Sequence, residues 1–285
     1  MNQTTLKDSL MIAGGIGLHS GAPTRLVFYP APANHGIQFH RSDLDIKIPA
    51  TWEYAETSPL CTTITKDGVK LHTIEHLLSV CSGMGIDNLL VELSSDEVPI
   101  FDGSGYVFFE RFSEVGLKEL SEPRLALKIK EPVSFTKGDI RIIATPAAAT
   151  SFTFSIDFEH QQVGAQEYHF VFNETNYKDE IVAAKTFCAE KDVQKMLAQG
   201  LAKGGSEKNA IILGSDGEFK NMEVMTWLNE PNLHKILDQI GDFYLAQNRR
   251  ILGSIYSHKS GHASHLEFLR HLMTEKQSAW EWVRV

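Results

Sequence analysis

The sequence predicts an α+β protein of two similar halves, each made of strands followed by helices. Strand-like and helix-like segments occur in this order twice, and the polar, proline-containing stretch Glu119–Arg124 separates the two series. We therefore expect a first α+β domain over residues 1–120 and a second over residues 125–285. The length of 285 residues, with 42% hydrophobic and 22% charged residues, is typical of a globular chain and argues against disorder.

The first half is predicted to begin with strands and to continue with helices. β-branched and aromatic residues predict a strand at Thr24–Tyr29, and Asn88–Leu93 is expected to form a buried strand. An apolar stripe predicts a helix over Leu71–Cys81, and Tyr106–Val115 is predicted as a second amphipathic helix. A glycine soon after each helical pattern supplies a stop signal.

The second half repeats this order. Clean alternation of apolar residues predicts a strand at Phe152–Phe158, and composition predicts a helix over Ile181–Gln199. A further helix is expected over Asn229–Gln247, with Asn229 as a possible cap and Pro231 at an early position. A last helix is expected near Ser264–Thr274.

Charge and cysteine content limit the partners and the compartment. The formal net charge of −9 gives no long-range attraction to nucleic acid or anionic lipid, so nucleic acid is not expected as the main partner. A local basic patch for a phosphorylated small molecule stays open. An odd and sparse set of three cysteines fits a reducing compartment. The N-terminus lacks the basic region of a signal peptide, and no apolar run approaches the roughly 18 residues of a membrane span. We expect a cytoplasmic monomer without a transmembrane segment.

The segment His72-Thr73-Ile74-Glu75-His76 matches the H-x-x-E-H pattern of inverzincin metalloproteases. On a helix, His72 and His76 would share a face, and Glu75 could reach a water bound to a metal. The alternative is a helix with two surface histidines, because short motifs match by chance.

A second candidate segment begins at His234. His234, Asp238 and Asp242 are spaced by four and would lie along one stripe of a helix. An unpaired buried stripe of this kind is costly, and a metal ion would remove that cost. The alternative is a solvated face on which Lys235 pairs with Asp238.

The two segments together suggest a catalytic zinc site. Such a site takes about three protein ligands and leaves one position open. His76 from the first helix, with His234 and Asp238 from the second, gives that number, and Glu75 is then the candidate base.

Two glycine-containing segments carry further histidines. Lys259-Ser260-Gly261-His262 follows a predicted strand, and His262 could act as a general acid that Asp242 keeps protonated. The alternative is an ordinary loop histidine. The glycines from Gly14 to Gly21 lack the spacing of a dinucleotide-binding loop, so a tight turn that presents His19 is expected instead.

Matching segments along nearly the whole chain give a resemblance to a known family, the UDP-3-O-acyl-N-acetylglucosamine deacetylases, which are zinc enzymes of lipid A synthesis. The combination of TIEHLL, HKILDxIGD and KSGH is specific. The matching segments are GGIGLHSG at Gly14, HTIEHLLS at His72, GIDNLLVEL at Gly85, PIFDGSG at Pro99, AKTFC at Ala184, GLAKGGSEKNAII at Gly200, HKILDQIGDFYL at His234 and YSHKSGH at Tyr256.

The resemblance implies a role for each matched residue. His76, His234 and Asp238 would bind Zn²⁺, or Fe²⁺ in the cell; His72 would not. Glu75 would be the general base, and His262, oriented by Asp242, the general acid or electrostatic partner. The other implied roles are oxyanion stabilisation by Thr186, substrate contacts by Phe187 and Lys235, a position near the nucleotide for His19, and a place in the pocket for Cys61.

The resemblance also implies a fold and a reaction. The fold would be two similar β-α-α-β domains packed as a sandwich with the active site between them. An insert near 187–213 would hold the acyl chain of the UDP-sugar substrate. The reaction would be hydrolysis of the N-acetyl group, giving acetate and a free amine.

The chain departs from the family pattern at Leu233 and at Asn229–Asn232, which puts substrate contacts near Lys235 in question. A peptidase using His72, His76 and Glu75 is the alternative enzyme. A structural zinc protein is the alternative outside enzymes, and the few scattered cysteines argue against it.

Overall fold

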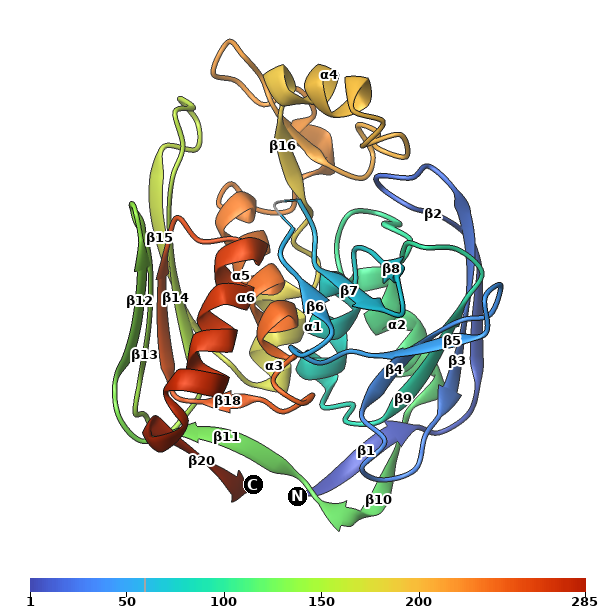
Figure 1. Ribbon diagram of the computed structural model, residues 1–285. Coiled ribbons are helices and arrows are strands. Elements are labelled where there is room, and N and C mark those ends of the chain that lie inside the picture. The colour runs from blue at the N-terminus through green and yellow to red at the C-terminus, as the bar shows by residue number, and fades with distance from the viewer. Residues whose placement is uncertain (59) are drawn as a thin grey trace.

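Two five-stranded sheets of the same topology form the outer layers of the computed structural model, which describes residues 1–58 and 60–285 (Figure 1). In both sheets the last strand along the chain lies in the centre. It is antiparallel to one neighbour and parallel to the other. The first sheet has the order β2 (Leu10–Ile16), β3 (Pro23–Pro30), β9 (Leu89–Leu93), β4 (Ile37–Arg41), β5 (Ile46–Pro49). The second has the order β12 (Val133–Lys137), β13 (Ile140–Thr145), β19 (Ser254–His258), β14 (Ser151–Asp157), β15 (Ala165–Val171).

Helices lie between the sheets, with one exception. The helices are α1 (Glu75–Met84), α2 (Tyr106–Val115), α3 (Glu174–Asn176), α4 (Glu190–Ala198), α5 (Glu230–Phe243) and α6 (His262–Arg270). The exception is α4, which lies beyond one end of the sandwich (Figure 1). Turns of π-helix occur at Tyr177–Ile181 and His271–Glu275, and short 3₁₀ turns at Met222–Val224 and Gln277–Ala279. Helices α1 and α5 lie side by side between the sheets (Figure 1). The layers therefore run sheet, helix, helix, sheet, as an α+β sandwich.

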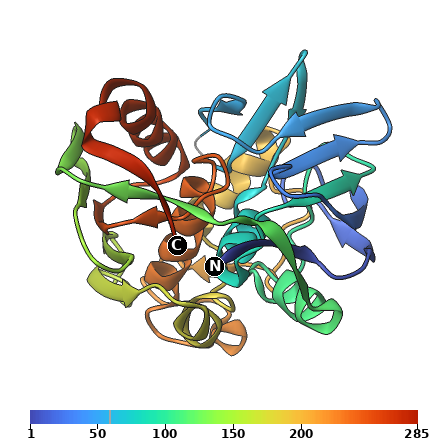
Figure 2. The same cartoon turned by 90° about the horizontal axis from the view of Figure 1, so that it is seen from below.

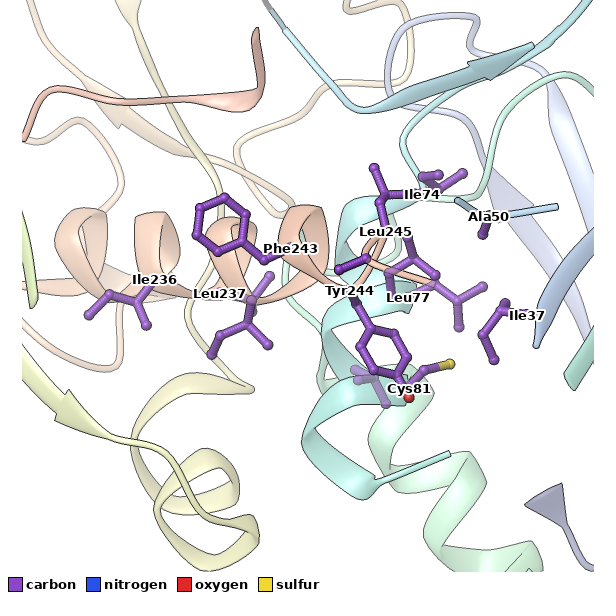
Figure 3. Packing of buried hydrophobic residues seen from close by; sticks show 14 of the residues in the cluster. Ile37, Ala50, Ile74, Leu77, Cys81, Ile236, Leu237, Phe243, Tyr244 and Leu245 are labelled. Carbon is purple, nitrogen blue, oxygen red and sulfur yellow. The ribbon is translucent and has the colours of Figure 1, made fainter. Parts of the chain in front are cut away.

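Apolar residues of both halves join in one core. Alternation along β14 buries Phe152, Phe154 and Ile156, as predicted for this strand. Figure 3 shows the contact between the two central helices, where Tyr244 and Leu245 lie beside Leu77 and Cys81. Burial of such side chains stabilises a fold by about 1.5–3 kcal/mol each, so this shared interior is a main source of stability.

Shorter strands close the ends of the sandwich. They are β1 (Asn2–Leu6) with β10 (Leu117–Pro123); β6 (Ala55–Glu56), β7 (Thr63–Lys66) and β8 (Val69–Leu71); β18 (Ile251–Leu252), β11 (Leu125–Ile129) and β20 (Trp280–Arg284); and β16 (Phe187–Ala189) with β17 (Ile211–Leu213). The view from below in Figure 2 shows the two termini close together, and the Met1 amino group donates to the Val285 carbonyl.

Two predictions of local structure were wrong. The stretch Glu119–Arg124, predicted as a linker, lies almost wholly in β10, where polar residues occupy a largely exposed strand paired with β1. The predicted helix Ile181–Gln199 contains β16, because Phe187–Ala189 pairs with a distant strand. The domain limits 1–120 and 125–285 stay a prediction. Among the described residues, no helix combines the length and apolar composition needed to cross a membrane.

Candidate metal and catalytic site

Helix α1 begins at Glu75, four residues later than predicted. The preceding Thr73 has a φ of 59°, a left-handed conformation that is strained for a β-branched residue. His72 therefore lies before the helix, where its backbone forms an isolated parallel β-bridge with Glu97. Its side-chain Nδ1 is 3.0 Å from Thr63 Oγ1. The prediction that His72 and His76 share a helical face was wrong. Glu75 and His76 instead occupy the buried first turn.

Helix α5 carries His234, Asp238 and Asp242 on one stripe, as predicted, and all three are buried. The alternative of a solvated face was therefore wrong, but the ion pair that it included is present: Lys235 Nζ donates to Asp238 Oδ2 at 2.6 Å. Asn229 does not cap this helix with its side chain. The buried carboxylate of Glu230, the first residue of the helix, instead accepts hydrogen bonds from the backbone N–H of Lys185 and Trp227 at 2.9 and 3.2 Å, so it ties two preceding segments to the start of α5.

The two central helices bring three possible ligand atoms together. His234 Nε2 and His76 Nε2 lie 3.3 and 3.7 Å from Asp238 Oδ1. His234 Nδ1 is 2.9 Å from the Ala184 carbonyl, to which only a protonated Nδ1 can donate. This contact leaves the Nε2 lone pair of His234 free to face the cluster, which is the arrangement found around metal-binding histidines.

The chemistry of this cluster fits a zinc ion. Ligands about 2.0–2.1 Å from a tetrahedral zinc lie about 3.3–3.4 Å apart, close to the spacings observed here. Asp238 Oδ1 is buried and has no hydrogen-bond partner within residues 1–58 and 60–285. Burial and the nearby His234 lower the pKa of His76 to about 3, so its imidazole is neutral, as a metal ligand must be.

Glu75 lies beside this cluster and is 2% exposed. Its Oε2 accepts a hydrogen bond of 2.9 Å from the backbone N–H of Thr62, and its Oε1 is 3.9 Å from His262 Nε2. Burial raises the pKa of Glu75 well above its usual value, and the nearby Asp242 adds to this effect. A carboxylate with a raised pKa is suited to accept a proton near neutral pH.

His262 is the first residue of α6, not a loop residue. Its Nδ1 is 2.9 Å from Asp242 Oδ2, and its Nε2 is 3.8 Å from Asp238 Oδ2. Burial alone would lower the pKa of His262, but the surrounding carboxylates, Asp242 foremost, raise it to about 10. The imidazole is therefore held in its protonated form.

A cavity of about 290 Å³ opens onto these groups. Thr186, Phe187 and Lys235 line it, and Lys235 Nζ lies 5.7 Å from the centre of the Phe187 ring. A larger cavity of about 740 Å³ adjoins it. The two share Leu60, Phe158 and Phe187 as lining residues.

His19 and Cys61 are not among the residues that line the smaller cavity. Burial would raise the pKa of the Cys61 thiol, but interactions with His19 and His72 lower it to about 5. Glu97 holds the neighbouring turn, because it accepts hydrogen bonds from the backbone N–H of His19 and Ser20 at 2.8 Å each.

Comparison with known proteins identifies the family. The family model described as "LpxC: UDP-3-O-acyl N-acetylglycosamine deacetylase" matches residues 3–274. The chain belongs to this deacetylase family.

Curated relatives agree with the family assignment. A UDP-3-O-acyl-N-acetylglucosamine deacetylase of Hahella chejuensis is 41% identical over 99% of this chain and 94% of its own length. Deacetylases of the same name from Xanthomonas campestris and Myxococcus xanthus are each 40% identical, over 99% and 96% of this chain and 93% and 87% of their own lengths. The predicted resemblance to this family is therefore confirmed.

Sequence reasoning missed two buried residues of this deacetylase chain. Thr62 donates its hydroxyl to Asp242 Oδ1, and His265 Nδ1 lies 2.7 Å from Asp242 Oδ2. Thr62 is part of no recognisable sequence motif, so the sequence alone could not identify it. His265 lies three residues after His262, about one helical turn away, and this spacing could have predicted that the two histidines lie close together.

Proposed function

We propose that this chain hydrolyses the N-acetyl group of UDP-3-O-acyl-N-acetylglucosamine, giving acetate and the free amine, in an early step of lipid A synthesis. The observation that carries the proposal is the meeting of His76, His234 and Asp238 beside the buried Glu75. Family membership and the named activity of the relatives support it.

Zn²⁺ is the proposed cofactor, with Fe²⁺ as the alternative in the cell. His76, His234 and Asp238 would hold the ion. When bound, it would supply Lewis-acid activation of the acetamide carbonyl and of water. Two imidazoles and a carboxylate, with space on the cavity side, suit an open catalytic site better than a closed structural one.

The remaining steps fall to side chains around the cavity. Glu75 takes the proton of the attacking water, for which its raised pKa suits it. The Thr186 hydroxyl stabilises the oxyanion of the tetrahedral intermediate. His262, kept protonated by Asp242, donates a proton to the departing amine.

Substrate recognition is proposed for residues on the cavity wall and for two others. Lys235 and Phe187 contact the substrate, and His19 lies toward the nucleotide. Cys61, which lines neither of the two cavities, is proposed as a pocket residue from the family resemblance. The segment 187–213 would guide the acyl chain, since Phe187, Met196 and Leu213 line the larger cavity. The departures at Leu233 and Asn229–Asn232 do not alter the ligand atoms.

We further propose two α+β domains, a cytoplasmic location and a monomer. Cys61, Cys81 and Cys188 are free thiols, which fits a reducing compartment.

Metal analysis paired with acetate release tests the proposal. We expect about one zinc per chain, loss of acetate release from UDP-3-O-acyl-N-acetylglucosamine with a chelator, and recovery when zinc is restored. His234→Ala should lose the metal, whereas His72→Ala should keep it. If His72→Ala lost the metal and His234→Ala kept it, the result would favour the peptidase alternative.

A further inference from the structure

His265 is an ionisable residue next to the site that the proposed mechanism does not use. It is 0% exposed on α6 and does not line the cavity. Its ring packs edge-on against Phe154 and Phe243, with ring centres 6.2 and 5.5 Å away. These contacts fix the plane of the imidazole.

Both ring nitrogens of His265 have a defined partner. Nδ1 is 2.7 Å from Asp242 Oδ2, and Nε2 is 2.9 Å from Ser260 Oγ. A carboxylate only accepts hydrogen bonds, so Nδ1 carries the hydrogen. Burial lowers the pKa of His265, so Nε2 carries none and accepts a hydrogen bond from the Ser260 hydroxyl. His265 is thereby held as one neutral tautomer.

Asp242 receives a donor on each of its oxygens. The Thr62 hydroxyl donates to Oδ1, while His262 and His265 both donate to Oδ2. These bonds also explain why Asp242, His262 and His265 lie close enough to suggest a second metal site. Asp242 Oδ2 lies 2.7 Å from His265 Nδ1 and 2.9 Å from His262 Nδ1, and both nitrogens carry a hydrogen. These contacts are hydrogen bonds, so the cluster does not need a metal ion.

We propose that His265 is a positioning residue for the reaction, acting through Asp242 on His262. It fixes the carboxylate through the hydrogen bond to Oδ2, and through Ser260 it also fixes the turn that precedes His262. The free Nε2 of His262 is thus kept facing Glu75 and Asp238, at 3.9 and 3.8 Å. This inference rests on the proposed deacetylase function.

Two substitutions separate this role from simple packing. In His265→Asn the amide nitrogen stands where imidazole Nδ1 stands, so the donor to Asp242 is kept. In His265→Leu a side chain of similar bulk has no donor. Leu269→Ala, at a fully buried position of the same helix about two turns after His262, is the control for lost stability alone.

The experiment compares kcat, KM and melting temperature of the zinc-loaded, folded proteins, with acetate release as the assay. Loss of an outer-shell partner typically costs about 10–100-fold in activity. We expect His265→Leu to lose kcat in that range with KM within about twofold, and His265→Asn to recover most of that loss. Leu269→Ala should melt at a lower temperature with unchanged kcat.

Two results would overturn the inference: wild-type kcat in His265→Leu, or equally low kcat in His265→Leu and His265→Asn. If His265→Leu does not fold, His265→Ala takes its place in the same comparison. A wild-type enzyme without chelator-sensitive acetate release would refute the proposed function itself, so the two failures are distinguishable.

Discussion

Glu75 and His262 are neighbours in the lining of the cavity, with Glu75 Oε1 3.9 Å from His262 Nε2, and their surroundings shift their pKa values by different means. Burial raises the pKa of Glu75, whereas nearby carboxylates raise that of His262 to about 10. Each group is thereby matched to one direction of proton transfer: Glu75 can accept a proton, and His262 can donate one.

Glu75→Gln tests the first of these roles. The amide keeps the size of the side chain but cannot take a proton, so we expect kcat to fall by about 10²–10⁴-fold. Zinc content should stay at the wild-type level, because Glu75 is not a proposed ligand. Turnover at the wild-type rate would remove Glu75 from the mechanism.

Glu97 stabilises the strained backbone that precedes the site. It is 1% exposed and accepts hydrogen bonds from the backbone N–H of His19 and Ser20 and from the Thr73 hydroxyl. Burial alone would raise its pKa, but these donors lower it. The ionised carboxylate therefore stabilises the fold above the usual pKa of glutamate, and this contribution is lost as the pH falls through the lowered pKa.

Glu97→Gln is expected to remove that pH dependence. At pH 7 the unfolding free energy of the variant should be about 1.5–3 kcal/mol lower than that of the wild type. The reason is that the NH₂ group of the glutamine would point at an N–H or O–H donor and could not accept its hydrogen bond. Between pH 7 and pH 3, denaturant titrations should show a smaller loss of stability in the variant than in the wild type. Glu207→Gln, at an exposed side chain, is the control and should retain the wild-type slope. Equal slopes in Glu97→Gln and the wild type would contradict this role.

At the scale of the element, the close approach of α1 and α5 sets the distance between the ligands. A Cβ atom on Gly241 would lie 2.1 Å from the Glu75 carbonyl oxygen and 3.1 Å from the Ser79 nitrogen. Since Glu75 and His76 are on one helix and His234 and Asp238 on the other, any separation of the helices also opens the proposed metal site.

Gly241→Ala should therefore damage the site as well as the fold. Overpacking of this kind costs about 1–3 kcal/mol, and a displacement of about 1 Å at a site can cost about 100-fold in rate. Gly138→Ala is the matched control: its φ of 59° costs about 1–2 kcal/mol, and a Cβ there meets nothing within 4 Å. We expect the two variants to lose similar amounts of stability, and kcat to fall only in Gly241→Ala. An unchanged kcat in Gly241→Ala would show that the helices can separate without disturbing the site.

At the scale of the whole molecule, the two sheets share one interior. Buried side chains from both sheets and both central helices form a continuous cluster, shown in part in Figure 3. Neither sheet can expose its inner face without also exposing the helix that covers it. The two proposed domains are therefore expected to depend on each other for stability.

Calorimetry can test this dependence. We expect a single unfolding transition whose calorimetric and van't Hoff enthalpies agree, although chains of this length often unfold in steps. Zinc should raise the transition temperature of the wild type, and this shift should be smaller in His234→Ala, because binding to the native state alone stabilises it. Two separate transitions would show that the halves unfold independently.

The sequence by itself determined three of the elements that carry or frame the site and the types of the candidate ligands. Alternation marked β14, the apolar stripe with its glycine stop marked α2 at its observed limits, and the spacing of four placed His234 and Asp238 on one stripe of α5. These features depend on residues close in the chain, so local periodicity is enough to reveal them.

Only the tertiary structure decided where α1 begins, that Glu119–Pro123 forms a strand, and that Thr62 and His265 meet at Asp242. Each of these outcomes depends on a strand, a carboxylate or a helix contributed by another part of the chain. Strand pairing and the satisfaction of buried polar groups are contacts between distant segments, and the local sequence does not contain the identity of the distant partner.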